Sequence, residues 1–463
     1  MPADGDHDAA ARERSALFVA TLTSFMGPFM ISSVNVALPS IQAELGMSAV
    51  QLSWIPTAYL LAMAMVLVPA GRVADIHGRK RIFTAGLVVY TIASTLAALV
   101  PTTAWLIALR VGQGIGAAMF VTTGMAIVTS VFPPQRRGRA IGIYVAAVYI
   151  GLSVGPFAGG LLVQHVGWRS LFALMLPLGA VSVGVTLRFL KGEWAEARGE
   201  PLDIVGSLLY AGAIFALVYG GTALPSAAGG LLALGGLVGL LLFARRQARI
   251  AHPVFDVSLF RTNRVFAFSS LAALINYAAT FAITFMLSLF LQYIKGLPPQ
   301  TAGLVLVAQP AVMALFSPLA GRWADRIQPR WIASAGMLLT TLGLVGLLFL
   351  HPDVAIGRIV VNLALLGLGF ALFSSPNMSA IMGSVAKHQY GIASGAVATM
   401  RLLGQMISMA VAAVVLAITI GQAAIAPANY PQLLGSLQIL LAIFAGMCIF
   451  GIYFSMARGE IGK

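Results

Sequence analysis

The chain has 463 residues, of which 59% are hydrophobic and only 9% are charged. This composition excludes a water-soluble globular protein, because the apolar residues exceed what one soluble core buries and form long uninterrupted runs. The formal net charge of +14 does not indicate nucleic acid as a partner, because the basic residues form short, separated clusters.

Stretches without Asp, Glu, Lys or Arg run through most of the chain, and most of them hold the roughly 20 residues that cross a bilayer as a helix. They are 15–43, 45–71, 82–109, 111–135, 140–168, 170–187, 204–244, 265–294, 296–321, 331–352, 359–386 and 402–457. Two of them hold a pair of helices: 204–244 turns at GGTALPSAAGG, and the last region, whose first helix starts near Gly391, turns at GQAAIAPANYPQ. We therefore predict an all-α polytopic membrane protein with fourteen helices.

The basic residues indicate the orientation in the membrane. Only Arg169, Lys295 and Arg358 fall in loops of one side, and Arg110 and Arg401 fall inside helices, whereas all other Lys and Arg fall in the tails and loops of the opposite side. Because cytoplasmic loops carry the excess of Lys and Arg, we expect a multi-pass protein of the cell (inner) membrane with both termini in the cytoplasm. The polar segment 1–14 lacks the pattern of a signal peptide, so we predict a cytoplasmic tail.

An internal repeat divides the chain. Gly71, Arg72, Ala74 and Asp75 recur 250 residues later as Gly321, Arg322, Ala324 and Asp325, and five glycines between 114 and 151 recur 253 residues later. Such duplication is typical of transporters. We therefore predict a tail at 1–14, a six-helix bundle at 15–190, a linker with an extra helix pair at 191–264, a second six-helix bundle at 265–456 and a tail at 457–463.

The extra pair has almost no polar residues, so we expect it outside the main bundles and away from any substrate. Asp203 at its start is most simply a helix N-cap.

Two charged or glycine-rich motifs stand out against this apolar background. GRVADIHGRKR at 71–81 combines Asp75 with Arg72, Arg79 and further cations; a solvated anchoring loop explains the cations but not the aspartate, the glycines or the second copy. In the helix at about 140–168, Gly151, Gly155 and Gly159 form a smooth face and Pro156 removes a helical hydrogen bond.

Two cations lie inside otherwise uncharged helices. Arg110 shares a helix face with Gln113, and Arg401 shares one with Gln405. An unpaired cation in a membrane costs at least ~2.5 kcal/mol, so both arginines should face the protein interior. Both pairs could line a central cavity; a structural role, in which Arg401 holds carbonyl groups of neighbouring helices, remains nearly as good an explanation for that residue.

Together these motifs resemble the major facilitator superfamily. GRVADIHGRKR is similar to its loop signature between the second and third helices, LIALRVGQGIGAAMF to the arginine motif of its fourth helix, and YIGLSVGPFAGG to the fifth-helix motif of its antiporters. SSVNVALPSI, WRSLF and GIASGAVATMRLLGQ extend the resemblance to the 14-helix drug:proton antiporter family. The resemblance implies that Asp75, Arg72 and Arg79 form a cytoplasmic latch whose aspartate pairs with an arginine and a helix N-terminus of the opposite half. It also implies that Arg110 takes part in coupling, and that Gly155 and Pro156 belong to a motif that indicates export.

One feature departs from that family. Many members carry an aspartate in the first helix, but the matching position here is Met30. All 14 carboxylates and all 6 histidines fall in tails, loops or helix ends, which leaves no titratable proton carrier in the membrane core. Proton coupling would then need Asp75, another boundary carboxylate or the ionisation of the substrate. A cavity with two arginines and no acid predicts a preference for neutral, amphipathic or anionic compounds.

Polar side chains on several helices could contact a substrate in a central cavity. The candidates are Asn35, Tyr59, Gln113, Asn276, Tyr277, Gln309, Asn362, Asn377, Arg401 and Gln405. Each alone is more often a packing residue, and Asn35 and Gln113 are preferred because their helices carry motifs.

We expect a membrane exporter of small lipophilic or amphipathic compounds, similar to multidrug efflux proteins, that works by alternating access and is driven by protons. The alternative is an exporter of a specific metabolite, organic anion or lipid-like molecule without proton coupling. A channel or a respiratory proton pump would need a filter motif or charged residues in mid-membrane. No catalytic, metal or cofactor motif occurs, so we expect no enzyme, and partners limited to a small-molecule substrate, protons and the lipid bilayer, with the chain as a monomer.

Overall fold

The computed structural model describes residues 3–224, 226–324, 326–386 and 389–459, and within these ranges it contains helices and no strand. The first part holds α1 (Ala3–Leu45), α2 (Ala49–His77), α3 (Arg79–Ala97), α4 (Thr103–Val131), α5 (Pro134–His165), α6 (Arg169–Ala173) and α7 (Met175–Phe189). The extra pair and the short helix that follows it are α8 (Ile204–Thr222), α9 (Ala227–Gln247) and α10 (Ser258–Thr262). The last part holds α11 (Arg264–Leu289), η1 (Phe290–Ile294), α12 (Pro299–Leu306), α13 (Ala308–Ala324), α14 (Pro329–Leu348), α15 (Ile356–Gly383), α16 (Tyr390–Thr419), η3 (Pro427–Asn429) and α17 (Tyr430–Ala457).

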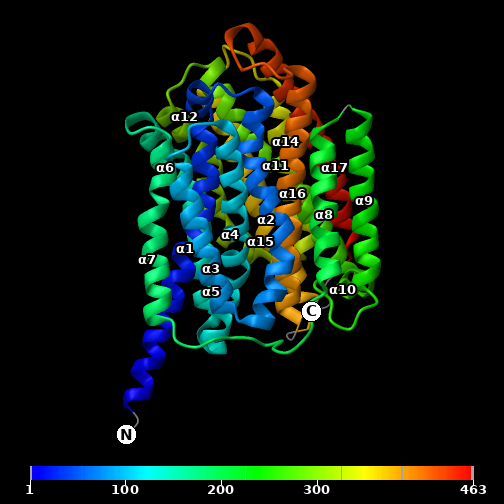
Figure 1. Cartoon of the computed structure of the whole chain (residues 1–463). Helices are drawn as coiled ribbons and strands as arrows, with labels where there is room; N and C mark the ends of the chain where they lie inside the picture. Colours follow the sequence, from blue (N-terminus) through cyan, green and yellow to red (C-terminus); the bar gives the residue numbers. More distant parts are fainter. Residues whose placement is uncertain (1–2, 225, 325, 387–388, 460–463) are drawn as a thin grey trace.

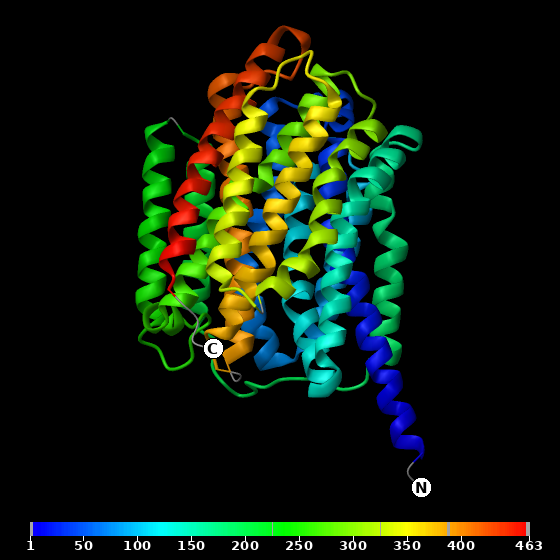
Figure 2. The ribbon, with the colours of Figure 1, turned by 180° about the vertical axis from the view of Figure 1, so that it is seen from behind.

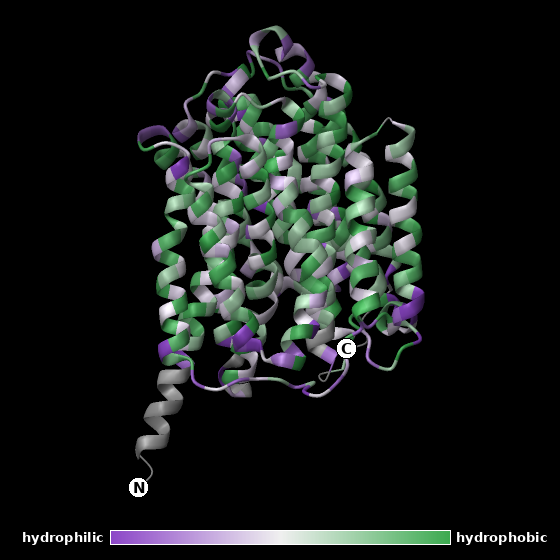
Figure 3. Ribbon diagram, in the orientation of Figure 1, coloured by the Kyte–Doolittle hydropathy of each residue, from purple (hydrophilic) through white to green (hydrophobic). Residues whose placement is uncertain are grey.

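The helices stand side by side along one axis (Figure 1). Thirteen spans in the described residues are long and apolar enough to cross a membrane. The remaining long helix, α3, begins with three basic residues and packs in the bundle beside α4 and α7. With α3 included, the arrangement agrees with the fourteen predicted helices. Figure 3 shows hydrophilic residues mostly at the two ends of the bundle.

We call the end where α1 begins and α17 ends the terminus side, and the opposite end the far side (Figure 1). The helix α1 extends to Ala3, so the segment predicted as a polar tail continues the first helix, and the apolar span itself starts at Glu13. In the sequence-based assignment, Arg458 belonged to the C-terminal tail, but the structure buries its side chain at the end of α17.

The two predicted halves repeat the same helix packing. In the first half α1 packs on α5, α2 on α4, and α3 on both α4 and α7. In the second half α11 packs on α16, α13 on α15, and α14 on both α15 and α17. The order of the packing pairs is therefore the same in both halves, as a duplicated bundle requires. The exact boundaries at 190 and 265 stay a prediction.

Glycine contacts repeat as well. A Cβ atom on Gly116 would lie 2.6 Å from the carbonyl oxygen of Gly86, which brings α3 and α4 into backbone contact. In the second half, a Cβ on Gly336 would lie 2.6 Å from the carbonyl oxygen of Gly369, between α14 and α15. These two pairs occupy equivalent places in the repeat, so the repeated glycines serve close packing of equivalent helices.

The extra pair α8 and α9 lies at the edge of the bundle (Figures 1 and 2), as predicted. Its inner helix α8 contacts both α2 and α16, which belong to different halves, and Tyr219 of α8 packs on Trp54 of α2 with ring centres 6.0 Å apart. The predicted cap is confirmed, because the Asp203 carboxylate accepts a hydrogen bond of 2.9 Å from the Gly206 amide at the start of α8.

Candidate functional site

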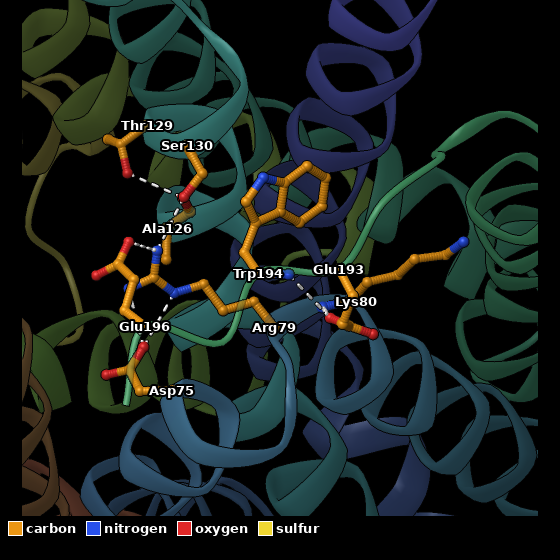
Figure 4. A network of polar contacts seen from close by, with 9 residues as sticks. All are labelled: Asp75, Arg79, Lys80, Ala126, Thr129, Ser130, Glu193, Trp194 and Glu196. Atoms are coloured by element: carbon orange, nitrogen blue, oxygen red, sulfur yellow. Dashed lines mark hydrogen bonds and ion pairs between the residues drawn. The ribbon is translucent and has the colours of Figure 1, made fainter. Parts of the chain in front are cut away.

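The segment predicted as a loop is helical up to His77 and again from Arg79, and this junction of α2 and α3 forms a compact polar network on the terminus side (Figure 4). Arg79 is 9% exposed, and its Nε donates to Asp75 Oδ1 at 2.9 Å. Its Nη1 donates to Ser130 Oγ of α4 at 2.8 Å and to Glu196 Oε1 of the linker at 2.7 Å. The predicted neighbours Asp75 and Arg79 therefore contact each other, with two further acceptors around the same guanidinium.

The linker between α7 and α8 also binds this junction through its main chain. The amide of Arg79 donates to the carbonyl of Trp194 at 2.8 Å, and the amide of Lys80 donates to Glu193 Oε1 at 2.8 Å. These are N–H groups of the first turn of α3, which have no partner inside the helix. The negative charge of Glu193 also suits a helix N-terminus.

A glycine makes this approach possible. Gly78 has φ 116°, and Glu193 occupies the place where a Cβ of residue 78 would stand. On the other flank, the Ala197 amide donates to the Asp75 carbonyl at 2.9 Å. The linker is thus held against the end of α2 and the start of α3.

A second ion pair extends this contact. Arg72 Nη2 lies 2.5 Å from Glu200 Oε2, and the same oxygen lies 2.8 Å from His252 Nδ1. The hydrogen bond from Arg72, followed by that from His252, lowers the pKa of the Glu200 carboxyl. Glu193, Glu196 and Glu200 therefore all bind the α2–α3 region. Sequence reasoning missed this role, although three glutamates in thirteen linker residues beside a basic loop are a usable signal.

The contacts described above do not include the predicted latch partner of Asp75 in the opposite half. Apart from the bond between Asp75 and Arg79, every contact described above comes from α4, the linker or the segment after α9. Asp325, the aspartate of the second motif copy, lies outside the described residues. A cross-half bond of Asp75 stays a prediction.

Arg110 is completely enclosed in the first half. Its side chain is 1% exposed, its Nε donates to the Ile55 carbonyl of α2 at 3.0 Å, and its guanidinium carbon lies 4.4 Å from the centre of the Tyr59 ring. Its Nη1 donates to Gln113 Oε1 at 2.8 Å, and Gln113 Nε2 donates to Ser94 Oγ of α3 at 2.7 Å. In this conformation Tyr59 and Gln113 are packing residues between α2, α3 and α4, and a contact of either with substrate stays a prediction.

On the far side, hydrogen bonds join the two halves. Ser288 Oγ of α11 donates to the Asn35 carbonyl of α1 at 2.7 Å, and Gln292 Nε2 of η1 donates to the Val36 carbonyl at 3.0 Å. Tyr293 also bonds Gln42, and the Ala49 amide donates to the Ala423 carbonyl at 2.9 Å. Asn35, a candidate for substrate contact, therefore lies at the junction of the halves. It joins them through its main-chain carbonyl and not through its side chain. Its side-chain oxygen is buried and has no partner among the described residues.

The α5 motif contacts two different helices. Ser33 Oγ of α1 donates to the Gly155 carbonyl at 2.9 Å, and a Cβ on Gly159 would lie 2.6 Å from Ser33 Cβ. On its other face, Gly160 approaches Pro299 of α12, and Gly303 of α12 approaches the Pro156 carbonyl. The motif therefore packs tightly within its own half and, at the far side, directly against the other half.

Arg401 faces the opposite half from α16. It is half-buried and has an electrostatic interaction with Tyr144 and Tyr149 of α5. Within the described part of the chain, it has no hydrogen-bond or ion-pair partner. Tyr149 also packs in a small cluster with Tyr277 of α11 and Phe370 of α15. This region brings Arg401 and Tyr277, both candidates, near Tyr149, which sequence reasoning missed because a single tyrosine in an apolar helix carries no signal. Gln405, one turn after Arg401, is also half-buried.

The remaining candidates for substrate contact all lie in the second half; they are Asn276, Gln309, Asn362 and Asn377. Asn362 Nδ2 donates to the Arg358 carbonyl at 2.9 Å, and Asn362 packs on Gly346 of α14. Gln309 on α13 is half-buried. Asn276 is completely buried, and neither atom of its amide has a partner among the described residues.

Asn377 binds Arg458, a buried cation that the sequence analysis assigned to the C-terminal tail. Its Nδ2 donates to the Ser269 carbonyl at 3.1 Å, and its Oδ1 accepts a hydrogen bond of 2.8 Å from Arg458 Nη1. Arg458 is 1% exposed and donates further to both Ser455 and Ser269. Burial lowers the pKa of Arg458 to about 10. Neutral acceptors alone therefore hold this guanidinium between α11, α15 and α17. In the described residues, no group of His, Cys, Asp or Glu is arranged to hold a metal ion.

Comparisons with known proteins agree with this architecture. The profile of the Major Facilitator Superfamily matches residues 17–409 and 269–459. The chain is 32% identical to a riboflavin transporter, RibZ, of Clostridioides difficile, over 84% of each chain. It is 35% identical to the multidrug resistance protein Stp of Mycobacterium tuberculosis, over 85% of this chain and 74% of that one. Among solved structures, it resembles a bacterial homologue of the human lysosomal transporter Spinster, in an inward-facing and unoccupied conformation, with TM-score 0.67, 17% identity and coverage of 96% and 97%.

Proposed function

The chain belongs to the major facilitator superfamily, and we propose that it exports small lipophilic or amphipathic compounds across the cell membrane by alternating access. Stp, named for multidrug resistance, and the cephamycin export protein CmcT of Amycolatopsis lactamdurans, 32% identical over 93% of this chain, support export. The observation that carries the proposal is the α5 motif, which packs on α1 in its own half and on α12 in the other.

The proposed cycle follows from which contacts join the halves. The far side is closed by Ser288, Gln292 and Gly303 against the first half. We assign the far side to the cell exterior, because the basic loops lie on the terminus side. The state described here is then closed to the outside. Opening the exterior end requires these bonds to break and the end of α2 with the start of α3 to bind the opposite half.

The substrate class follows from the charges in the membrane spans. Arg401 is a half-buried cation without an acidic partner among the described residues, and it interacts electrostatically with Tyr144 and Tyr149. Such a site attracts anionic or electron-rich groups and repels monovalent cations. We propose that neutral, amphipathic or anionic compounds bind near Arg401, Gln405, Tyr149 and Tyr277.

The proposed driving force is the proton gradient. In the spans, the described carboxylates stand near helix ends, where Glu44 pairs with Arg169 and Asp75 pairs with Arg79. We propose that a proton is carried by a boundary carboxylate such as Asp75 or by the ionisable group of the substrate. Substitution Asp75→Asn tests the first route: pH-dependent transport that persists in this variant excludes Asp75 as the proton carrier.

A second candidate function is export of one specific metabolite. The observation that favours it is the similarity to RibZ, a riboflavin transporter, which extends over most of both chains. A specific exporter would transport one member of a compound panel far faster than the others, whereas a multidrug exporter would transport many.

One experiment tests both candidates. Inside-out vesicles with the full chain are incubated with a panel of neutral drugs, organic anions, riboflavin and cationic dyes in the outer medium, with and without a pH gradient. We expect accumulation of several neutral or anionic compounds that depends on the gradient. Strong, electrogenic transport of monovalent cationic dyes would contradict the proposed site, and no transport of any drug would contradict the multidrug function.

A further inference from the structure

The outermost helix α9 presents a continuous stripe of side chains to the surroundings. Leu234 and Leu241 are each 58% exposed, and Val238 between them is 47% exposed. Residues spaced three or four apart lie on one helix face. In a membrane this stripe faces lipid acyl chains, since α9 stands at the edge of the bundle (Figure 3).

The same stripe ends in two arginines on the terminus side. Arg245 follows Leu241 by four residues, and Arg249 follows Arg245 by four, so both continue the lipid-facing row of α9 and the turn after it. Both side chains are exposed, and neither has a hydrogen bond or ion pair within the described chain. Two like charges at this spacing repel each other unless an anion lies between them.

The third arginine of this cluster is already neutralised. Arg246 Nη2 lies 2.7 Å from Asp203 Oδ1, the carboxylate that caps α8. The Asp203 carboxylate is therefore occupied by Arg246 and by the Gly206 amide, and Arg245 and Arg249 have no ion-pair partner among the described residues.

The cluster borders a shallow groove with an apolar side. The groove measures ≈ 600 Å³ and is lined by Leu242, Arg245, Arg246, Arg249 and Ile250. We call it the α9 groove. A guanidinium binds phosphate oxygens through two parallel hydrogen bonds, so a pair of them suits one phosphate group.

We propose that the α9 groove binds the phosphate of an anionic phospholipid, whose acyl chains lie along the stripe from Leu234 to Leu241. A lipid fits better than a soluble phosphate, because the cations continue an exposed apolar row and stand where that row ends. Basic residues next to membrane spans attract anionic lipids in this way. The extra helix pair would then bind lipid at this site, independently of the transported compound.

The test compares lipid retention by the full chain and two double variants. The purified proteins are reconstituted with phosphatidylglycerol or phosphatidylcholine, extracted mildly, and weighed with their bound lipids by native mass spectrometry. We expect Arg245→Gln with Arg249→Gln to lower retention of phosphatidylglycerol by about tenfold, with no change for phosphatidylcholine. Both side chains are exposed, so the variant should fold; the reactivity of the buried Cys448 with a thiol dye checks this.

The matched control removes the same charge from the same side outside the α9 groove. Arg188 at the end of α7 and Arg198 in the linker are both exposed, and Arg188→Gln with Arg198→Gln should retain phosphatidylglycerol as the unchanged chain does. Equal losses in both variants would indicate general surface attraction and overturn the site. Unchanged retention in the α9 variant would also overturn it, as would displacement of the lipid by an equal concentration of inorganic phosphate.

Discussion

Gly303 of α12 and Pro156 of α5 touch backbone to backbone across the two halves, with no room for a side chain at residue 303. Gly160 completes this contact from α5, since a Cβ there would lie 2.5 Å from the Pro299 carbonyl oxygen. The closure of the far side is therefore held by main-chain contact as well as by the hydrogen bonds of Ser288 and Gln292.

Substitution Gly303→Ala should disfavour the state closed on the far side. The added methyl group meets a carbonyl, which cannot rotate away, and overpacking of this kind costs roughly 1–3 kcal/mol. We expect spin labels on the far ends of α1 and α11 to move apart in pulsed electron resonance distances, and transport to slow by about tenfold.

The control for this effect is Gly212→Ala on α8. Gly212 is exposed with no atom within contact of a Cβ, so the substitution brings the same gain in helix propensity without the clash. Unchanged distances and unchanged transport in Gly303→Ala would show that the α5–α12 contact does not control the closure.

Most of the fold could be predicted from the sequence, because apolar length and positions without charge determine which segments become helices. The end of α8 at Thr222 and the start of α9 at Ala227, like the end of α16 at Thr419 and the start of α17 at Tyr430, fall where proline, glycine and small residues interrupt the apolar runs. The repeat was visible because equivalent helix pairs need glycine at equivalent contacts, as Gly116 and Gly369 show. The helical extension of α1 to Ala3 was not predictable from its polar composition.

Less of the candidate site could be predicted, because the sequence of a helix does not determine which neighbouring helix packs on each of its faces. Arg110 and Gln113 share a face as expected, but that face meets Tyr59 and Ser94 inside one half. In the sequence, Arg458 follows an apolar span like any membrane-flanking arginine. In the structure its side chain is buried and donates hydrogen bonds to Ser269 and Asn377. The linker glutamates act through tertiary contacts that no local pattern encodes.

Substitution Asp75→Asn should slow transport by about tenfold or more while the protein remains folded in the membrane. The carboxylate orients Arg79, and we propose that it must bind the opposite half during the cycle. Glu196→Gln should have a smaller effect, because the Glu196 side chain is 69% exposed and a solvent-exposed ion pair contributes little. Vesicle transport at equal protein amounts measures both. A larger loss in Glu196→Gln than in Asp75→Asn would contradict the latch role of Asp75.

Arg110 and Arg401 should respond differently to alanine. Arg110→Ala leaves the buried Gln113 oxygen and the Ile55 carbonyl without their donor, so we expect less folded protein and a lower unfolding temperature. Arg401 has no such partners, so Arg401→Ala should keep the unfolding temperature and lose transport of anionic compounds first. Detergent extraction with a thermal scan separates the two outcomes. An equal loss of folded protein in both variants would show that Arg401 is structural.

Asn276 and Asn377 form a matched pair for stability. Asn276→Leu removes a buried amide that has no partner in the described chain, so the free energy of unfolding should stay equal or rise. Asn377→Leu removes the acceptor of the buried Arg458 guanidinium and should cost roughly 1–3 kcal/mol. The only cysteine, Cys448, is completely buried, so its labelling by a thiol dye on heating reports unfolding directly. A lower labelling temperature for Asn276→Leu than for Asn377→Leu would contradict this assignment.

Acid should release the linker from the α2–α3 region. The folded pKa of Glu200 lies below its ordinary value of 4.5, so the stabilisation that this carboxylate gives is complete above pH 4.5 and is lost as the pH falls through the lowered pKa. We expect hydrogen exchange at residues 193–200 to increase between pH 5 and pH 3, after correction for the intrinsic exchange rate. Glu200→Gln should show the faster exchange already at pH 7, with a weaker change on acidification. Exchange that accelerates equally in the amides of α14, which belongs to the other half of the chain, would instead indicate general acid unfolding and would refute the specific release of the linker.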